Sequence, residues 1–253
     1  MHSLFISDLH LCAQRPDTTR LFQAFIRHTA PAAEALYILG DLFEYWAGDD
    51  DLDTAFHLEI TQTLRALAEH GTRVFIMHGN RDFLMRKELA AACHAQLLPD
   101  PVKLDLYGTP TLLSHGDALC TDDTAYQEFR RQVRDSTWQQ QFLAIPLPQR
   151  KAQIEGLRAQ SSAEKQHKSM DIMDVNLQAV HGILQAHAYP RLIHGHTHRP
   201  AHHVHHLDGH TCDRWVLGDW DTHANALRCD ANSVRWENIP GAPAQTEHPL
   251  TLL

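Results

Sequence analysis

The sequence predicts an α/β fold, and three observations lead to this class. Short apolar runs rich in β-branched and aromatic residues recur along the chain. Segments with helical spacing of their apolar residues lie between the first of these runs, and a small or polar cluster follows each run. Strands that alternate with helices are typical of α/β proteins, in which ligand-binding residues collect beyond the carboxyl ends of the strands.

Six apolar runs are predicted to be buried strands, since their length and composition suit strands better than helices. In chain order they are Leu4–Ile6, Ala35–Leu39, Val74–Met77, Thr111–Leu113, Arg191–Ile193 and Trp215–Leu217. The polar clusters that follow them begin at Ser7, Gly40, His78, Ser114, His194 and Gly218.

Amphipathic helices are predicted over Thr18–Thr29 and Asp53–His70, where the apolar residues form one stripe. The stretch from Asp122 to Ala188 is nearly all helical in pattern, with an interruption at Pro146 and Pro148. We interpret its first part, residues 122–168, as a helical cap inserted into a single domain of residues 1–253. The end of the chain, residues 241–253, is predicted to be a loose tail.

Composition excludes several classes of protein. The net charge of −9 argues against a general nucleic-acid binder, because phosphate backbones select basic faces. The five cysteines contain no C-x-x-C pair, so reduced thiols are expected rather than disulfides or a thiolate zinc site. We find no signal peptide and no run of about 18 apolar residues, and nothing indicates an obligate protein partner. A soluble or surface-associated protein is expected.

Metal-binding residue types recur at the predicted strand ends. Asp8 and His10 are two residues apart, so on extended chain both side chains face one side. His194 and His196 repeat this spacing at another strand end. Three further candidates adjoin glycines, which allow the backbone to turn sharply and approach a ligand closely; they are Asp41, Asn80 and His115.

These seven residues predict a centre with two divalent metal ions. Carboxylate, amide and imidazole ligands without cysteine suit a borderline-hard cation, and manganese, iron and zinc are all compatible with them. Seven ligands exceed the needs of one ion but serve two that share a carboxylate. Two ions roughly 3.5–4 Å apart are a common device of phosphoryl chemistry, because together they clamp phosphate oxygens and activate water.

The ordered motifs resemble those of the calcineurin-like metallophosphoesterases. The blocks are D-x-H, G-D, G-N-R-D, H-G-D and G-H-T-H, from Asp8 to His198. A closer similarity, to the family of UDP-2,3-diacylglucosamine hydrolases of lipid A biosynthesis, covers six longer blocks: Ile6–Leu11, Leu39–Trp46, Gly79–Leu84, Ser114–Asp117, Met173–Asn176 and His194–Pro200. It also includes Arg158, Ser161 and Lys168 in the helical segment.

The resemblance implies a four-layer α/β/β/α sandwich and hydrolysis of UDP-2,3-diacylglucosamine to UMP and 2,3-diacylglucosamine 1-phosphate, with water attacking the α-phosphorus. It implies manganese as the usual metal. The first ion would be held by Asp8, His10, Asp41 and His196. The second would be held by Asp41, Asn80, His115 and His194, so that Asp41 bridges. His198 could support a neighbouring ligand instead of binding metal.

Arg81 bears on the leaving group. Many relatives carry histidine at this position, where it can protonate an alkoxide, whereas arginine cannot act as an acid near neutral pH. Arg81 therefore favours a phosphate leaving group and would neutralise charge that develops on a diphosphate. We expect Asp41, Asn80, Arg81, His115 and His194 to take part in catalysis.

The predicted cap is basic and partly apolar. Residues 126–168 hold eight basic and four acidic residues, a net charge of +4. Such a segment could contact anionic lipid and acyl chains, or its apolar face could simply pack on the core. The resemblance favours an acyl-chain groove, a peripheral position on the cytoplasmic face of the inner membrane, and substrate contacts from Asn80, Arg81 and His194 together with Asp123, Ser161, Lys165 and Lys168. Relatives often have a small polar amide at the position of Lys165.

The other histidines are interpreted as structural or solvated. The cluster of His202, His203, His205, His206 and His210 is predicted to be an exposed edge that could bind adventitious metal. Two competing functions remain at this point. One is a soluble nucleoside-diphosphate-sugar pyrophosphatase or cyclic-nucleotide phosphodiesterase, and the other is a non-catalytic scaffold.

Overall fold

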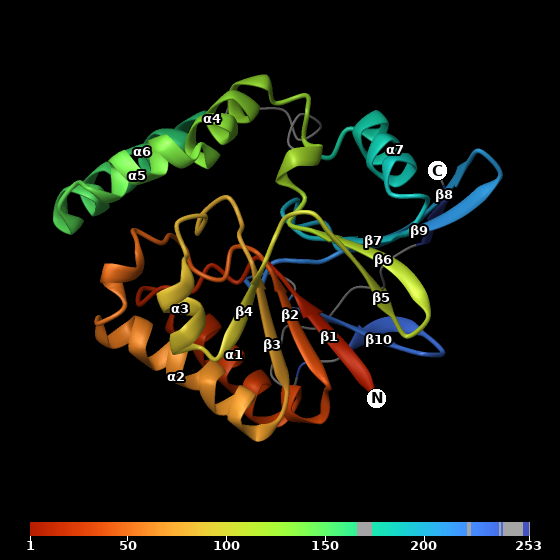
Figure 1. The fold of residues 1–253 in the computed structure, drawn as a ribbon, viewed down its shortest axis with the longest axis horizontal. Helices are drawn as coiled ribbons and strands as arrows, with labels where there is room; N and C mark the ends of the chain where they lie inside the picture. The colour runs from red at the N-terminus through yellow and green to blue at the C-terminus, as the bar shows by residue number, and fades with distance from the viewer. Residues whose placement is uncertain (166–173, 222–223, 238, 240–249, 253) are drawn as a thin grey trace.

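Two six-stranded sheets form the centre of the computed structural model, which describes residues 1–165, 174–221, 224–237, 239 and 250–252 (Figure 1). The first sheet has the order β11 (Val234–Glu237), β10 (Ala226–Asp230), β1 (His2–Ile6), β2 (Ala35–Leu39), β3 (Arg73–Met77) and β4 (Ala95–Leu98). The second has the order β12 (Leu250–Leu252), β8 (Ala201–Leu207), β9 (His210–Val216), β7 (Arg191–His194), β6 (Thr109–Ser114) and β5 (Val102–Leu106).

Side-chain alternation along the strands separates the layers of the core. In β1, Phe5 belongs to the apolar cluster between the sheets, whereas Leu4 and Ile6 belong to the cluster on the opposite face. Both faces are therefore apolar, as expected for strands β1 to β4, which run parallel and are covered on each side. The inter-sheet cluster also contains Ile193 and Trp215 from the second sheet.

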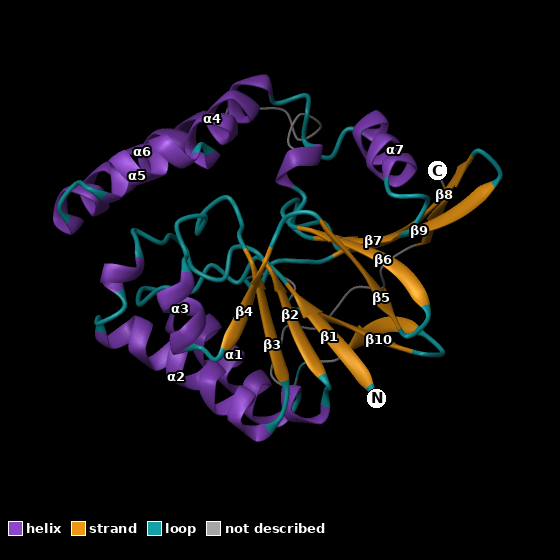
Figure 2. Cartoon of the chain, in the orientation of Figure 1, coloured by secondary structure: helices purple, strands orange, loops and turns teal. Residues whose placement is uncertain are grey.

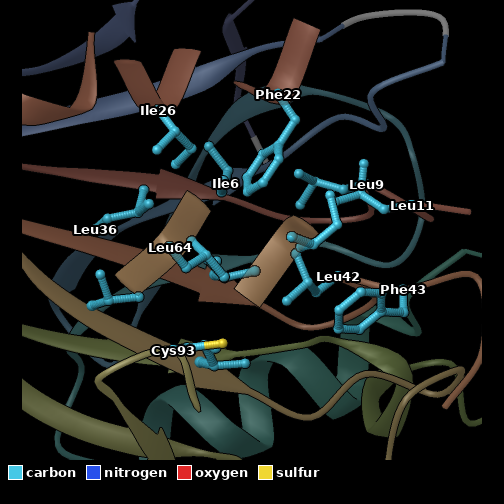
Figure 3. Close-up of a cluster of buried hydrophobic side chains, with 14 of the residues drawn as sticks. Ile6, Leu9, Leu11, Phe22, Ile26, Leu36, Leu42, Phe43, Leu64 and Cys93 are labelled. Carbon is cyan, nitrogen blue, oxygen red and sulfur yellow. The ribbon is translucent and has the colours of Figure 1, made fainter. Parts of the chain in front are cut away.

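Helices cover the two outer faces. The layer on the first sheet consists of α1 (Pro16–His28), α2 (Ala55–His70) and α3 (Lys87–Ala92), and α7 (Leu177–Ala186) covers the second sheet (Figure 2). Figure 3 shows Phe22 and Ile26 of α1 and Leu64 of α2 packed with Ile6 and Leu36 of the sheet. The predicted α/β/β/α sandwich is thus confirmed. Short 3₁₀ turns occur at Ala30–Ala32, Asp49–Asp51 and Asp117–Leu119.

Three helices form the cap: α4 (Thr124–Arg134), α5 (Ser136–Leu143) and α6 (Leu147–Lys165). Figure 1 places them beyond the carboxyl ends of β1 to β3. Much of their apolar surface faces the protein, since Phe142, Leu143, Ile145 and Ile154 pack on the core cluster of the first sheet. None of the helices in the described part of the chain is long and apolar enough to cross a membrane.

All six predicted strands and both predicted helices are present, with ends shifted by a few residues. The prediction of a loose tail is wrong for Leu250–Leu252, because this segment pairs with β8 as the edge strand β12; residues 240–249 lie outside the described residues. The prediction of an exposed histidine edge is wrong for His205, which is buried in β8. Alternation in that strand turns His205 toward α7, whereas His206 is exposed.

Candidate metal centre and active site

The segments after β1 and β2 run side by side and carry the first ligands. The backbone amide of Asp8 donates to Gly40 O at 3.1 Å, and that of His10 donates to Asp41 O at 2.9 Å. Asp8, His10 and Asp41 all have positive φ angles between 49° and 56°. Non-glycine residues adopt this left-handed backbone at a cost, which the surrounding structure must offset. Such backbone strain is found most often at active sites and ligand-binding sites.

One candidate cluster consists of Asp8, His10 and His198. His198 Nε2 lies 3.3 Å from Asp8 Oδ1 and 3.3 Å from His10 Nε2. Asp8 Oδ1 and His10 Nδ1 are buried, and neither makes a hydrogen bond within the described part of the chain. Buried polar atoms without partners are rare, and a bound cation would satisfy both.

A second candidate cluster consists of Asp8, Asp41 and His115, all fully buried. His115 Nε2 lies 3.9 Å from Asp41 Oδ2 and 2.9 Å from Asn80 Oδ1. Asn80 Oδ1 also lies 2.8 Å from His196 Nδ1, so the amide oxygen joins two imidazoles. The structure thus brings together six of the seven ligands predicted from sequence and adds His198.

The electrostatics suit divalent cations. Burial lowers the pKa of His10 and that of His196 to about 3, so both imidazoles are neutral, as metal ligands must be. Burial raises the pKa of Asp41 to about 7, and the neighbouring carboxylates of Asp82 and Asp8 add to this effect against the opposing charge of His115. Two cations would remove this repulsion. The carboxylate, imidazole and amide donors therefore fit two divalent metal ions.

His194 lies apart from this cluster, in disagreement with the predicted ligand set. It is the last residue of β7, and it shares with Leu192 the face of the second sheet that α7 covers. Its Nδ1 lies 2.9 Å from Gly195 O, and its Nε2 lies 3.2 Å from the guanidinium of Arg214. A cation at this distance disfavours a metal ion at the same nitrogen.

His198 lies in the cluster with Asp8 and His10, where the prediction places His196. Burial opposes its protonation, but the nearby carboxylate of Asp8 raises the pKa of His198 above its usual value. The sequence did contain a usable signal, because His196 and His198 are also two residues apart. His196 and His198 have positive φ angles of 72° and 57°, so they lie in a turn and not in a strand. This turn nevertheless brings both side chains to the site.

Two motif glycines are required by close contacts at the site. A Cβ atom on Gly79 would lie 2.0 Å from Asp41 Oδ1, and one on Gly195 would lie 2.4 Å from Asp8 Oδ2. Real Cβ atoms do not approach heavy atoms so closely. The glycines therefore allow the segments after β3 and β7 to pass directly against the two buried carboxylates.

Arg81 lies at the edge of the metal cluster. Its backbone amide donates to Asp41 Oδ1 at 2.8 Å, and its Nη1 lies 3.3 Å from Glu44 Oε1. Arg158 of α6 also pairs with Glu44, and its guanidinium lies 5.4 Å from the ring centre of Tyr45. Two guanidinium groups, one from the core and one from the cap, thus lie beside the candidate metal centre. The prediction named Arg81 but gave no role to Glu44 or Arg158.

Helix α4 of the cap contacts the loops that carry the ligands. Arg134 donates to Gly79 O at 2.9 Å, directly before Asn80 in the chain. Arg130 and Tyr126 both donate to Asp117 Oδ2, at 2.8 and 2.6 Å. These contacts tie the cap to the segments after β3 and β6.

Most of the cap's cations pair with acids of the core. Arg150 pairs with Asp50, and Lys151 Nζ lies 2.5 Å from Asp51 Oδ1. Together with Arg130, Arg134 and Arg158, this accounts for five of the eight basic residues counted in the sequence of the cap. The positive charge of the cap is therefore directed largely toward the protein.

The remaining predicted substrate contacts are less defined. Asp123 caps the N-terminus of α4, where its side chain accepts a hydrogen bond from the amide of Tyr126 at 3.1 Å. Ser161 and Lys165 belong to α6, but their side chains lie outside the described part of the structure. Lys168 lies outside the described residues.

Metal binding is expected to release a proton from His115. Burial opposes a charge on this imidazole, but Asp41, Asp8 and Asp117 outweigh burial and raise the pKa of His115 to about 9. The metal-free protein therefore holds this proton at pH 7.5, and a bound metal must displace it. Apparent affinity for Mn²⁺ should rise with pH up to about 9. Calorimetric titration in buffers of different ionisation enthalpy measures the release, and binding without proton release at pH 7.5 would contradict the assignment.

Comparisons with known proteins give consistent results. The model of the calcineurin-like phosphoesterase family matches residues 1–200. A UDP-2,3-diacylglucosamine hydrolase of Aromatoleum aromaticum is 58% identical over 91% of this chain and 94% of its own length. A protein of the same name from Pseudomonas aeruginosa is 49% identical over 95% of this chain and 100% of its own. One from Edwardsiella ictaluri is 46% identical over 100% of this chain and 98% of its own.

Proposed function

The chain belongs to the calcineurin-like phosphoesterases, among the UDP-2,3-diacylglucosamine hydrolases, and we propose that it cleaves the pyrophosphate bond of UDP-2,3-diacylglucosamine. The products would be UMP and 2,3-diacylglucosamine 1-phosphate, and the reaction would be a step of lipid A biosynthesis. The observation that carries this proposal is the cluster of buried Asp8 and Asp41 with the imidazoles of His10, His115 and His198, beneath a helical cap.

We infer two sets of metal ligands from the geometry. The first comprises Asp8, His10, Asp41 and His198, and the second comprises Asp41, Asn80, His115 and His196. This proposal exchanges His194 for His198 relative to the sequence prediction. The ions, when bound, supply charge for the phosphate oxygens and an activated water near neutral pH. Manganese is the metal that we propose.

Residues of the chain itself would select a diphosphate. Arg81 and Arg158 can each donate paired hydrogen bonds to phosphate oxygens, and both are held beside the metal cluster by Glu44. Neither group can act as an acid near neutral pH, which suits a phosphate leaving group that needs no proton. Asp123, Ser161, Lys165 and Lys168 are proposed to contact the rest of the substrate from the cap.

Acyl chains would be recognised by the cap, which we place at residues 122–168 within a single domain. Among the cap residues whose side chains the structure describes, the large apolar ones that remain exposed are Phe129 of α4 and Leu157 of α6. We propose that the protein works at the cytoplasmic face of the inner membrane, where such a substrate would reside. Because most cap cations pair with core acids, this association should depend more on apolar contact than on anionic lipid.

Two measurements test this function. Purified protein with Mn²⁺ is expected to turn over the diacylated UDP-sugar much faster than its deacylated analogue, and preference for the deacylated compound would favour a soluble nucleotide-sugar substrate. In oxygen-18 water, mass spectrometry is expected to find the label in UMP. Label in the lipid phosphate would place the attack on the other phosphorus.

A further inference from the structure

A buried hydrogen-bonded chain lies behind the candidate metal centre, between the second sheet and α7. Its centre is Arg214 of β9, which is 5% exposed. Arg214 Nη1 lies 3.2 Å from His194 Nε2, and Arg214 Nε lies 3.2 Å from His205 Nε2. His205 Nδ1 in turn lies 3.4 Å from His181 Nε2 on α7. Figure 1 shows the elements that contribute these residues side by side.

The arginine determines which nitrogen of each imidazole carries the proton. A guanidinium has donors only, so His194 Nε2 and His205 Nε2 must both accept. The proton of neutral His194 is then on Nδ1, which donates to Gly195 O at 2.9 Å. A histidine that donates through Nδ1 and accepts through Nε2 has no nitrogen left for a metal.

Gly195 connects this chain to the ligands. Its amide donates to His115 O at 2.9 Å, and its carbonyl oxygen accepts from Thr197 N as well as from His194. The next amide, that of His196, donates to Asp8 Oδ2 at 2.8 Å. Fixing the peptide of Gly195 therefore fixes the turn on which His196 and His198 stand.

The cost of burying Arg214 points to a task beyond packing. Within the described part of the chain, no carboxylate lies at ion-pair distance from its guanidinium, and its hydrogen-bonded partners are two imidazoles. A buried charge without a counter-charge is destabilising, so an apolar side chain would serve packing alone better. We propose that Arg214, acting through His194, is a positioning residue that sets the Gly195–His198 turn for metal binding. This inference rests on the proposed metal centre.

The test compares Mn²⁺ binding by folded variants. Arg214→Met keeps an unbranched apolar side chain but removes the guanidinium donors, and we expect the dissociation constant of at least one Mn²⁺ site to rise about tenfold or more. The control is Arg191→Met on the neighbouring strand β7, where a half-buried guanidinium donates to Cys229 Sγ away from the site. The double variant Arg214→Met with His194→Gln should bind no more weakly than the weaker single variant, because both changes break one path.

A spectroscopic measurement needs no variant. In the metal-free wild-type protein, imidazole ¹⁵N spectra should show His194 with its proton on Nδ1, and a proton on Nε2 would overturn the inference. So would wild-type Mn²⁺ affinity in Arg214→Met, whatever its melting temperature. Loss of one metal per chain in His194→Gln, with wild-type Mn²⁺ affinity in Arg214→Met, would overturn the inference by making His194 a ligand, and it would leave the proposed function standing. Failure of the wild-type protein to bind Mn²⁺ would instead contradict the metal centre itself.

Discussion

Asp41→Ala is expected to lower turnover at least about a thousandfold while leaving the fold intact. The carboxylate is the residue that we propose both metal ions share, and metal-ion stabilisation of the transition state is worth several kcal/mol, with each ~1.4 kcal/mol equal to a factor of ten. The fold should survive because the side chain is a buried charge beside Asp8, and its loss removes that repulsion. Its hydrogen bond to the amide of Arg81 is a smaller loss.

The measurement combines turnover with metal content per folded chain. Far-UV circular dichroism establishes the fold, and Mn²⁺ titration should show fewer than two ions bound. Asp17→Ala serves as the matched control, since this carboxylate is exposed on α1 and pairs with Arg20 of the same helix. Rates near those of the wild-type protein in Asp41→Ala would rule out the two-metal arrangement.

The layered fold could be predicted from sequence because its strongest signals are local. Strands β1, β2 and β3 each end in an apolar run, and a polar motif follows it. The strands β8 and β12 gave no such signal. From the sequence, the histidines of β8 are interpreted as a solvated edge. The residues that contact buried His205 come from α7 and β9, which the pattern of β8 does not reveal. These contacts are distant in sequence and follow no spacing rule.

The metal site has the same limit: residue spacing can be read from the sequence, but contacts between distant segments cannot. Spacing of two residues paired Asp8 with His10, which the structure places in one cluster, but it applied equally to His194 with His196 and to His196 with His198. The choice depends on where β7 ends and on the positive φ angles of the turn that follows. It also depends on Arg214 of β9, whose guanidinium lies at hydrogen-bond distance from Nε2 of His194. Sequence pattern therefore identified the motif but not which two of its imidazoles reach the site.

The charge of the cap could be counted from sequence but not assigned to a partner. A net positive helical segment is compatible with an anionic membrane, yet Arg150 and Lys151 pair with Asp50 and Asp51 of the core. Asp50 and Asp51 belong to the 3₁₀ turn Asp49–Asp51, which presents their carboxylates to the cap. Complementary charge between two segments of one chain therefore accounts for much of what resembled a membrane-binding surface.

Gly195→Ala is expected to abolish Mn²⁺ binding at the proposed centre and to reduce turnover as severely as loss of a ligand. A Cβ atom here would lie 2.1 Å from Ser7 Oγ and 2.4 Å from Asp8 Oδ2. Ser7 Oγ lies 2.6 Å from that same carboxylate oxygen and 3.0 Å from Leu39 O, the two acceptors available to its one proton, so the hydroxyl cannot move away without losing its hydrogen bonding. The methyl group must therefore displace either Asp8 or the turn that carries His196.

Gly182→Ala is the matched control, because it adds the same methyl group where nothing lies within 4 Å. Gly182 is inside α7, where alanine should stabilise the helix by about 0.5–1 kcal/mol, so this variant should melt slightly higher and bind Mn²⁺ normally. Calorimetric melting and Mn²⁺ titration of both variants separate a steric effect at the site from a general effect of losing glycine. Normal Mn²⁺ binding by Gly195→Ala would mean that the turn can shift without cost, and it would also weaken the role assigned to Arg214, which acts through the same peptide.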